Sequence, residues 1–365
     1  MPKIVIVGCG VVGAAIAYEL SLVSNSENLD ITVLEAQPQI GQVSTKSALG
    51  VLMAACGCSK TQNEALSTLR LFSLLRFESL VTELEAKTGI NIPYNRHGIL
   101  LLFHDLEVED YMQTEVKWQA LIKLRNSQEF RMEWLDRDRL RSQYPSLQAT
   151  AGVYSFADRS IHPSYLMQAL VKGAELNGVK FICDRPVHNL SELDKLGADW
   201  VVVTAGLGSS ALMKPELKKD ILFSVGGQAI QVYLPNLNLK NVIYGDDTNI
   251  IPIGQDQYWI GATVEFNRLP LPRDENIDLL MQTAVKFCPA FAQAKILSSW
   301  AGDRPRPKTQ GAPILGFMPN RPNTLIATGH YRNGILMAPV TAQVIKDLIL
   351  EGKSDLPWQK QQLKF

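Results

Sequence analysis

Residues 3–20 read KIVIV, GCGVVG and AAIAYEL, and this stretch decides how the rest of the chain is interpreted. Residues 3–7 form a short β-branched apolar run, which predicts a buried strand. Residues 8–13 place glycine at three of six positions, and residues 14–20 have the alanine-rich spacing typical of a helix. The chain therefore opens with a strand, a glycine-rich turn and a helix.

A second apolar run, Ile31–Leu34, ends at Glu35, twenty-two residues beyond Gly13. Strand, turn, helix, strand and acid in this order are the fingerprint of a dinucleotide-binding βαβ unit. In such a unit Gly8 permits the tight turn, Gly10 lets the backbone approach a pyrophosphate, and Gly13 lets the helix pack closely on the strand. Glu35 is then expected to accept hydrogen bonds from the ribose hydroxyls of an adenosine.

The composition sets the class of protein. At 365 residues the chain exceeds one ordinary core, so two joined domains are expected. Lys+Arg and Asp+Glu both total 36, so the chain has no net charge that would attract nucleic acid. No run reaches the ~18 apolar residues of a membrane span. The fingerprint strand begins at residue 3, which leaves no room for a signal peptide, and a cytoplasmic protein is expected.

Five scattered cysteines stand at positions 9, 56, 58, 183 and 288. Cys56 and Cys58 are too close for a usual zinc pair, and no His or Cys pair stands at ligand spacing. We expect reduced thiols and no metal site.

The periodicity predicts the order of the larger elements. A long helix is expected from Asn63 to about Lys87, with its buried side formed by Leu66, Leu69, Leu71, Leu74, Leu75 and Phe77. Residues 222–300 alternate apolar and polar positions and predict a largely antiparallel sheet. Residues 324–350 repeat the order strand, glycine-rich turn, helix.

These patterns predict an α/β fold, with a discontinuous, doubly wound Rossmann-like domain and an inserted, mainly antiparallel β domain for the substrate. The nucleotide-binding domain is expected to comprise residues 1–87, 146–220 and 301–365, and the substrate domain residues 88–145 and 221–300.

The C-terminal third carries a more specific pattern. Residues 327–339 read ATGHYRNGILMAP, and residues 300–305 (WAGDRP) are followed by GAPILG at 311–316. These motifs resemble those of the D-amino-acid-oxidase-like FAD family, and most closely its glycine oxidase branch. Segments 44–50, 160–163 and 203–206 are similar to further landmarks of that family, in the same order.

The resemblance implies FAD as cofactor, held non-covalently; covalent attachment through one of the cysteines is the alternative. It implies roles for the matching positions. Val11 and Val12 match the pyrophosphate turn, Glu35 and Ala36 the ribose site, and Val187 the adenine site. Ser44, Thr45, Leu49, Gly50 and Val51 match the flavin-side loop, and Gly206 closes a family landmark. His330, Tyr331, Arg332, Asn333, Gly334, Ile335 and Leu336 match the segment that wraps the isoalloxazine.

Two arginines match active-site positions of the family. Arg332 matches the arginine that binds the substrate carboxylate, and Arg304 matches a second active-site arginine. A guanidinium can form two parallel hydrogen bonds with a carboxylate, which an ammonium cannot. Arg332 as a helix-terminus ion pair, and Arg304 neutralised by Asp303, are the structural alternatives.

One position departs from the family. Where the glycine oxidases carry a tyrosine, three residues before Pro252, this chain has Asn249. Asn249 is a candidate active-site residue that can hydrogen-bond but supplies no aromatic wall. Asp247, Thr248 and Asp303 also differ from the family pattern, so we expect a pocket more polar than that of a glycine oxidase. Such a pocket would suit a larger or cationic amino acid, another amine or an imino acid.

The resulting hypothesis is an FAD-dependent oxidoreductase that oxidises an amino acid or amine to its imine by hydride transfer to the flavin N5, and the imine hydrolyses to an oxo acid. Oxygen as electron acceptor makes it an oxidase; a quinone or electron carrier makes it a dehydrogenase, with peripheral docking to a membrane or partner. An NAD-binding protein and a non-catalytic flavoprotein subunit are the competing hypotheses, and a homo-oligomer is compatible with each.

Overall fold

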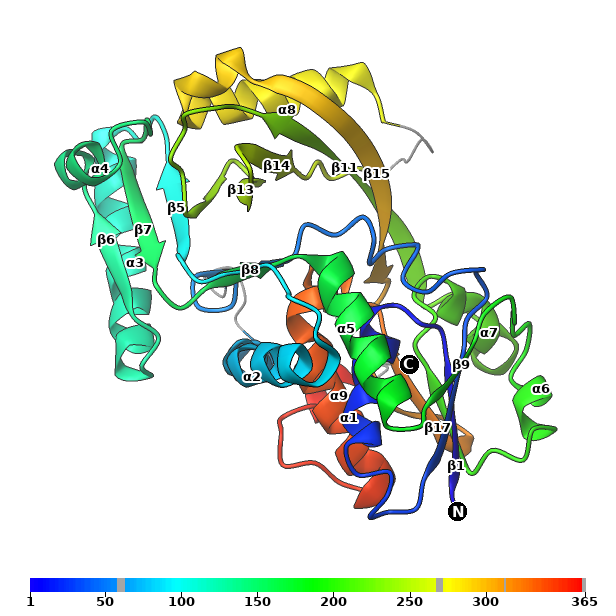
Figure 1. Cartoon of the computed structure of the whole chain (residues 1–365). Coiled ribbons are helices and arrows are strands. Elements are labelled where there is room, and N and C mark those ends of the chain that lie inside the picture. Colours follow the sequence, from blue (N-terminus) through cyan, green and yellow to red (C-terminus); the bar gives the residue numbers. More distant parts are fainter. Residues whose placement is uncertain (58–62, 267–271, 312, 363–365) are drawn as a thin grey trace.

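The computed structural model describes residues 1–57, 63–266, 272–311 and 313–362 (Figure 1). The helices are α1 (Val11–Ser21), α2 (Glu64–Thr88), α3 (Val108–Ser127), α4 (Arg137–Gln143), α5 (Pro163–Leu176), α6 (Ser191–Asp194), α7 (Gly208–Leu217), α8 (Asp274–Phe287) and α9 (Gly334–Leu350), with short 3-10 turns η2 (Pro289–Gln293), η3 (Tyr331–Asn333) and η4 (Gln359–Gln361). The strands are β1 (Lys3–Val7), β2 (Asp30–Leu34), β3 (Val51–Leu52), β4 (Tyr94–Asn95), β5 (Ile99–Phe103), β6 (Met132–Leu135), β7 (Ala151–Ser155), β8 (Arg159–Ile161), β9 (Lys180–Ile182), β10 (Trp200–Val203), β11 (Leu222–Tyr233), β12 (Val242–Gly245), β13 (Thr248–Gly254), β14 (Gln257–Gly261), β15 (Lys295–Pro307), β16 (Ile314–Met318) and β17 (Arg321–Thr328).

A six-stranded sheet in the order β16-β17-β10-β1-β2-β9 forms the lower half of the molecule in Figure 1. Its pairings are parallel except that between β16 and β17. The fingerprint strand β1 lies at the centre, with Val7 beside Val203 on one side and Leu34 on the other. The glycine-rich turn therefore follows a central strand, at the edge where parallel sheets bind their ligands.

The two faces of this sheet belong to separate apolar cores, which explains why β1 is apolar almost throughout. Ile4 and Ile6 pack into the core under α1, α2, α5 and α9, whereas Val5 and Val7 pack into the core that includes Leu193 of α6. Successive side chains of a strand point to opposite faces, so a strand covered on both sides must be apolar at every position. Figure 1 shows these helices on either side of the sheet.

An eight-stranded sheet in the order β15-β11-β14-β13-β12-β5-β7-β6 forms the upper half, with α8 packed on it (Figure 1). Its strands pair antiparallel except for β5 and β12, which pair in parallel. A small sheet, β3-β8-β4, lies between the halves. The predicted α/β class, with a nucleotide-binding sheet and a mainly antiparallel second sheet, is confirmed.

Two strands cross the expected domain boundaries. β7 lies in the eight-stranded sheet, although residues 146–220 were assigned to the nucleotide domain, and β15 runs through residue 300 without a break. We propose that each domain follows its sheet, which moves β7 into the substrate domain and makes β15 a shared strand.

The long helix α2 agrees with the prediction in its bounds but not in every buried position. The Asn63 side chain accepts a hydrogen bond from the Leu66 amide at its start, and Gly89 ends it at φ 71°. Leu75 was expected on the buried side, and this was wrong because its side chain is 63% exposed. Leu75 lies on the same stripe as Thr68 and Ser79, which faces solvent.

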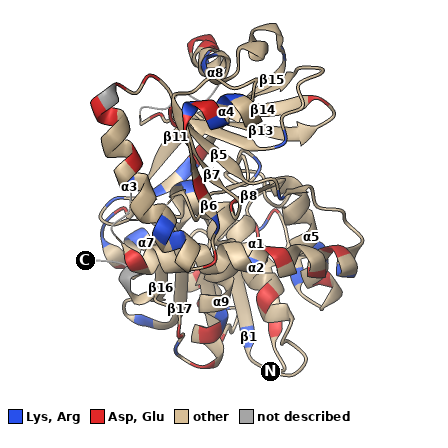
Figure 2. Ribbon diagram, turned by 90° about the vertical axis from the view of Figure 1, so that its left-hand side faces the viewer, with Lys and Arg blue, Asp and Glu red and all other residues tan. Residues whose placement is uncertain are grey.

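The segment Tyr331–Leu350 is long and apolar enough to qualify as a membrane span by composition. However, 67% of it is buried within the protein, where α9 packs against α1 and α2. The apolar composition of α9 is thus explained by its place in the core. Basic and acidic residues stand side by side on the surface helix α4 in Figure 2.

We predict that Gly13→Ala destabilises the chain strongly. A Cβ at residue 13 would lie 2.1 Å from the Gly8 carbonyl oxygen and 2.7 Å from the Thr204 hydroxyl, so backbone would have to shift. The expected loss is about 3 kcal/mol in the free energy of unfolding, measured by urea denaturation without added cofactor. Gly311→Ala is the matched control, because a Cβ there meets nothing within 4 Å. Equal stability of the two variants would contradict this account of the turn.

Candidate active site

A cavity of about 1260 Å³ lies at the carboxyl ends of the central parallel strands and extends to the eight-stranded sheet. This exceeds the ~300–1,000 Å³ of an ordinary small-molecule site, so the cavity has room for a large cofactor together with a substrate. Of the residues predicted for the site, Gly13 and Leu336 do not line the cavity. The predicted residues that line it are Gly8, Gly10, Val11, Val12, Glu35, Ala36, Ser44, Thr45, Leu49, Gly50, Val51, Val187, Gly206, Asn249, Arg304, His330, Tyr331, Arg332, Asn333, Gly334 and Ile335.

The glycine-rich turn brings backbone to the cavity wall. Gly8 has φ +100°, and a Cβ there would lie 2.7 Å from the Ala205 Cα. Helix α1 begins at Val11, whose amide donates to the Thr45 hydroxyl at 2.9 Å. The positive end of the α1 dipole therefore faces the cavity, which suits a phosphate group.

Glu35 lies at the end of β2, on the cavity wall. Its two carboxylate oxygens accept hydrogen bonds from the Cys9 amide at 2.7 Å and the Gln37 amide at 2.9 Å. These bonds fix the carboxylate while leaving lone pairs for ribose hydroxyls. Burial, and next the charge of Glu35, raise the pKa of the Cys9 thiol, which keeps this residue protonated.

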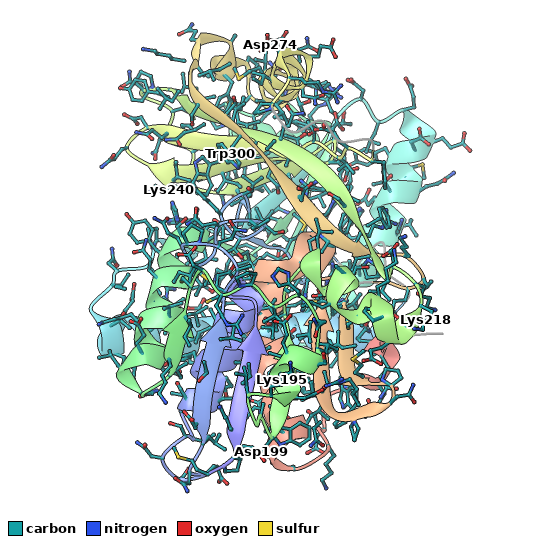
Figure 3. The ribbon with its side chains drawn as sticks, turned by 90° about the vertical axis from the view of Figure 1, so that its right-hand side faces the viewer. Lys195, Asp199, Lys218, Lys240, Asp274 and Trp300 are labelled. Carbon is teal, nitrogen blue, oxygen red and sulfur yellow. The ribbon has the colours of Figure 1, made fainter. Side chains whose placement is uncertain are left out.

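The loop at residues 44–51 is held from the eight-stranded sheet. Trp300 on β15, which Figure 3 labels, donates from Nε1 to the Ser47 carbonyl oxygen at 3.2 Å. Gly50 has φ +72°, and a Cβ at this residue would lie 1.8 Å from the Ile161 carbonyl oxygen. Thus the loop that contains Ser44, Thr45 and Leu49 lies pressed between the two halves of the molecule.

The start of α9 forms another part of the wall. His330 is 4% exposed, and its Nε2 lies 3.0 Å from the Thr341 hydroxyl. Burial lowers the pKa of His330 to about 3, so the ring is neutral near neutral pH. Leu336 points away from the cavity into the core, and its carbonyl oxygen accepts from Ser73 at 2.6 Å.

Arg304 on β15 lines the cavity and forms its hydrogen bonds with backbone carbonyl oxygens. Its Nη1 donates to the Gly226 carbonyl oxygen at 2.7 Å and to the Thr263 carbonyl oxygen at 3.1 Å. Burial, and next the charge of Arg332, lower the pKa of Arg304. The two predicted arginines are therefore close enough in the cavity to repel one another.

Arg332 is 39% exposed at its side chain, and its Nη1 lies 3.7 Å from Oδ1 of Asp247. Asp247 in turn accepts a hydrogen bond from the Tyr244 hydroxyl at 2.7 Å. Burial, and next this hydrogen bond, raise the pKa of Tyr244 and keep its hydroxyl protonated. Arg332, Asp247 and Tyr244 thus form a chain of polar contacts on the cavity wall.

Asn249 on β13 donates from Nδ2 to the Gly261 carbonyl oxygen at 3.1 Å. Its Oδ1 is buried and has no hydrogen-bond partner within the described part of the chain. A buried amide oxygen without a partner is costly, and here it lies on the wall of a cavity large enough for a donor. Asn249 is therefore suited to accept a hydrogen bond from a ligand.

Two residues of the site were not predicted. Asp158 is fully buried and accepts hydrogen bonds from the amides of Ala54, Ala55 and Cys56 at 2.7–3.0 Å, which fixes the loop beside the cavity. Arg70 on α2 lines the cavity and donates to the Asn333 side chain at 2.7 Å. Arg70 stands four residues from both Leu66 and Leu74, so the periodicity of α2 already places a charge on its buried face.

Cys9, Cys183 and Cys288 are free thiols, Cys56 is buried beside the cavity, and Cys58 lies outside the described residues. Among residues 1–57, 63–266, 272–311 and 313–362, no group of three or more His, Cys, Asp or Glu side chains is arranged to hold a metal ion.

We predict that His330 makes the protein less stable in mild acid. The folded-state pKa of about 3 lies below the unfolded value of 6.5, so the unfolded chain binds the additional proton as the pH falls through 6.5. The contribution of His330 is thus complete above pH 6.5 and is lost at about 1.4 kcal/mol per unit below it. Urea denaturation at pH 7.5 and 5.0 should show about 2 kcal/mol less acid sensitivity in His330→Gln than in the wild type. Equal sensitivity would refute the buried neutral histidine.

The comparisons with known proteins agree with this geometry. The family model described as FAD dependent oxidoreductase matches residues 3–348. The glycine oxidase of Bacillus subtilis is 27% identical over 97% of this chain and 94% of its own length. Crystal structures of glycine oxidase from Geobacillus kaustophilus (TM-score 0.88, 24% identical, 100% of this chain and 99% of that one) and L-proline dehydrogenase from P. horikoshii (0.83, 20%, 99% and 96%) share its fold.

The glycine-rich turn and Glu35 fit the cofactor of that family. Gly8 and Gly13 leave no space for side chains at the turn, and Glu35 presents a fixed carboxylate one strand away. FAD is accordingly the cofactor, and the chain belongs to the family of FAD-dependent oxidoreductases that includes glycine oxidase.

Proposed function

We propose that this chain oxidises an amino acid or a related amine to its imine, with FAD as the primary electron acceptor. The observation that carries the proposal is the joint presence of Arg332, Arg304 and the unpartnered Asn249 oxygen on the same cavity as the dinucleotide turn. Cations for a carboxylate and an acceptor for an amine N–H are what an amino acid requires of its site.

Arg332 binds the substrate carboxylate in this proposal. Its side chain is partly exposed to the cavity, and Asp247 at 3.7 Å is not within hydrogen-bond distance. An incoming carboxylate can therefore take the closer position, and the guanidinium fork then orients the substrate. Arg304, already fixed by two backbone carbonyls, adds positive charge but contributes fewer free N–H groups.

Asn249 holds the amino group. Its Oδ1 accepts from the neutral amine and thereby orients the lone pair and the α-hydrogen. A bound FAD would supply the hydride acceptor, at its N5, for the α-hydrogen and its electron pair. The carbon–nitrogen double bond forms as that hydride leaves, the nitrogen releases a proton, and water then hydrolyses the imine to an oxo acid and ammonia. This chemistry depends on orientation more than on a catalytic acid.

The pocket favours a substrate larger or more cationic than glycine. Asn249 stands where a larger aromatic side chain is typical of glycine oxidases, and the carboxylates of Asp246 and Asp247 line the same cavity. An acidic turn beside Arg332 attracts a second positive charge on the substrate. Oxygen, or a quinone or electron carrier, then reoxidises the flavin. We also propose that the protein acts in the cytoplasm, as expected from its sequence.

An anaerobic titration tests the reaction class. The purified protein should show a flavin band that is bleached by one group of amino acids, first in pools and then singly, with lysine, proline, alanine of both configurations and glycine included. Rapid return of the colour on admitting air identifies an oxidase, and slow return a dehydrogenase. A flavin band that none of these compounds bleaches would refute the proposed function.

We expect Arg332→Ala to raise the KM for carboxylate substrates by two or more decades, because ~3 kcal/mol of charge-assisted bonding is lost. The kcat should change much less, since the bond forms equally in the ground state. Arg332→Lys should recover part of the loss.

Arg96→Ala is the matched control, because Arg96 pairs with Glu78 on the surface and does not line the cavity. It should leave both constants unchanged. An unchanged KM in Arg332→Ala would show that the carboxylate binds elsewhere.

A further inference from the structure

Arg70 is a buried cation that the mechanism above does not use. It is 9% exposed, and its Nε and Nη1 have no hydrogen-bond partner within the described residues. Its Nη2 donates to the neutral side chain of Asn333 at 2.7 Å. None of the ion pairs found among the described residues involves this guanidinium, although Arg76, six residues along the same helix, pairs with Glu83 at 2.7 Å.

Such an arrangement is expensive in the protein alone. Two charges removed from water together can compensate one another, but a single buried charge without a counter-ion costs several kcal/mol. A neutral apolar side chain of similar length, such as methionine, would fill the same position of α2 without that cost. The retained arginine therefore indicates that its charge acts on something that is present only in the working protein.

The position of Arg70 indicates what that is. Its partner Asn333 directly precedes Gly334, the first residue of α9, and all three residues line the cavity. Nε and Nη1 are closed off from solvent, so a diffusing substrate cannot reach them. The positive charge of Arg70 must therefore act through the protein wall of the cavity, where the dielectric constant is low, on a group that lies against the start of α9.

We propose that Arg70 stabilises the negative charge that the flavin gains on reduction, and that it thereby raises the midpoint potential of the bound cofactor. The inference rests on the proposed placement of the flavin against the start of α9. Hydride transfer brings two electrons and one proton, so the ring system carries one additional negative charge until a second proton arrives. Arg70 and the positive end of the α9 dipole both lie at the start of α9, where each would stabilise that charge.

Arg70 is thus an electrostatic and positioning residue, and it does not touch the substrate. Its hydrogen bond also fixes Asn333, which sets the entry of the chain into α9. The charge effect distinguishes arginine and lysine from neutral residues of similar size, whereas the hydrogen bond to Asn333 does not.

The test is the midpoint potential of the FAD-loaded protein, measured by dithionite titration against a reference dye without any substrate. Arg70→Met should decrease the ratio of reduced to oxidised flavin at a fixed potential by about tenfold, a fall of about 30 mV for a two-electron couple. Arg70→Lys should stay near the wild-type potential. Without FAD, Arg70→Met should melt at the wild-type temperature or above it, because the unpaired charge is gone.

Arg76→Met is the matched control, since it removes an arginine from the same helix outside the cavity. It should leave the potential unchanged. If Arg70→Met does not accumulate, Arg70→Gln, which retains an N–H donor for Asn333, should show the same fall.

An unchanged potential in the neutral variants, or an equal fall in Arg76→Met, overturns the proposal. Because no substrate is used, a protein that binds FAD and titrates normally but oxidises no amine defeats the proposed function and leaves this inference intact.

Discussion

The close contact between Gly13 and the Gly8 carbonyl oxygen is the constraint on which the rest of the structure depends. A hydrogen atom is all that fits between Gly13 and the Gly8 carbonyl oxygen, and this lets α1 lie directly on the central strands. The Thr204 hydroxyl bridges the same place by donating to the carbonyl oxygens of Val7 and Gly8, at 3.0 and 2.7 Å. The amino end of α1, the end of β1 and the end of β10 are therefore fixed as one rigid wall. The positive end of the α1 dipole on this wall would favour a cofactor phosphate without a cationic side chain at the turn.

The other walls come from segments far apart in the sequence, and long strands connect them. β11 and β15 run from the eight-stranded sheet down beside the nucleotide-binding half, as Figure 1 shows. Trp300 and Gly302 on β15 meet the loop at Ser47, where a Cβ on residue 302 would lie 2.2 Å from that of Ser47. The shape of the cavity is thus set by pairing between strands. A change in the β11–β15 register would move Arg304 relative to the turn, although the two are almost three hundred residues apart.

Much of this could be read from the sequence, since it depends on local rules. The strand at residues 3–7, the glycine turn, the acid at Glu35 and the turn into the last helix are each encoded within a few residues. What could not be read depends on tertiary partners. Asp158 stands in a short polar turn, and its role appears only when the loop at residues 54–56 folds against it. Leu75 has the composition of a core residue, yet α2 has room for only one buried stripe. The parallel pairing of β5 with β12 joins segments that no sequence pattern links.

Four arginines line the cavity, and three of them have contrasting environments. Arg304 donates from Nη1 to two carbonyl oxygens, Arg332 faces the carboxylate of Asp247, and Arg70 has an amide as its partner. A guanidinium bound to carbonyls is held in place, and one near a carboxylate can exchange that partner for a ligand. A guanidinium enclosed with only an amide keeps its field unscreened. In the proposed reaction the same residue type therefore supplies a fixed wall, an exchangeable anchor and a positive potential beside the cofactor, and only the surroundings of each side chain separate these roles.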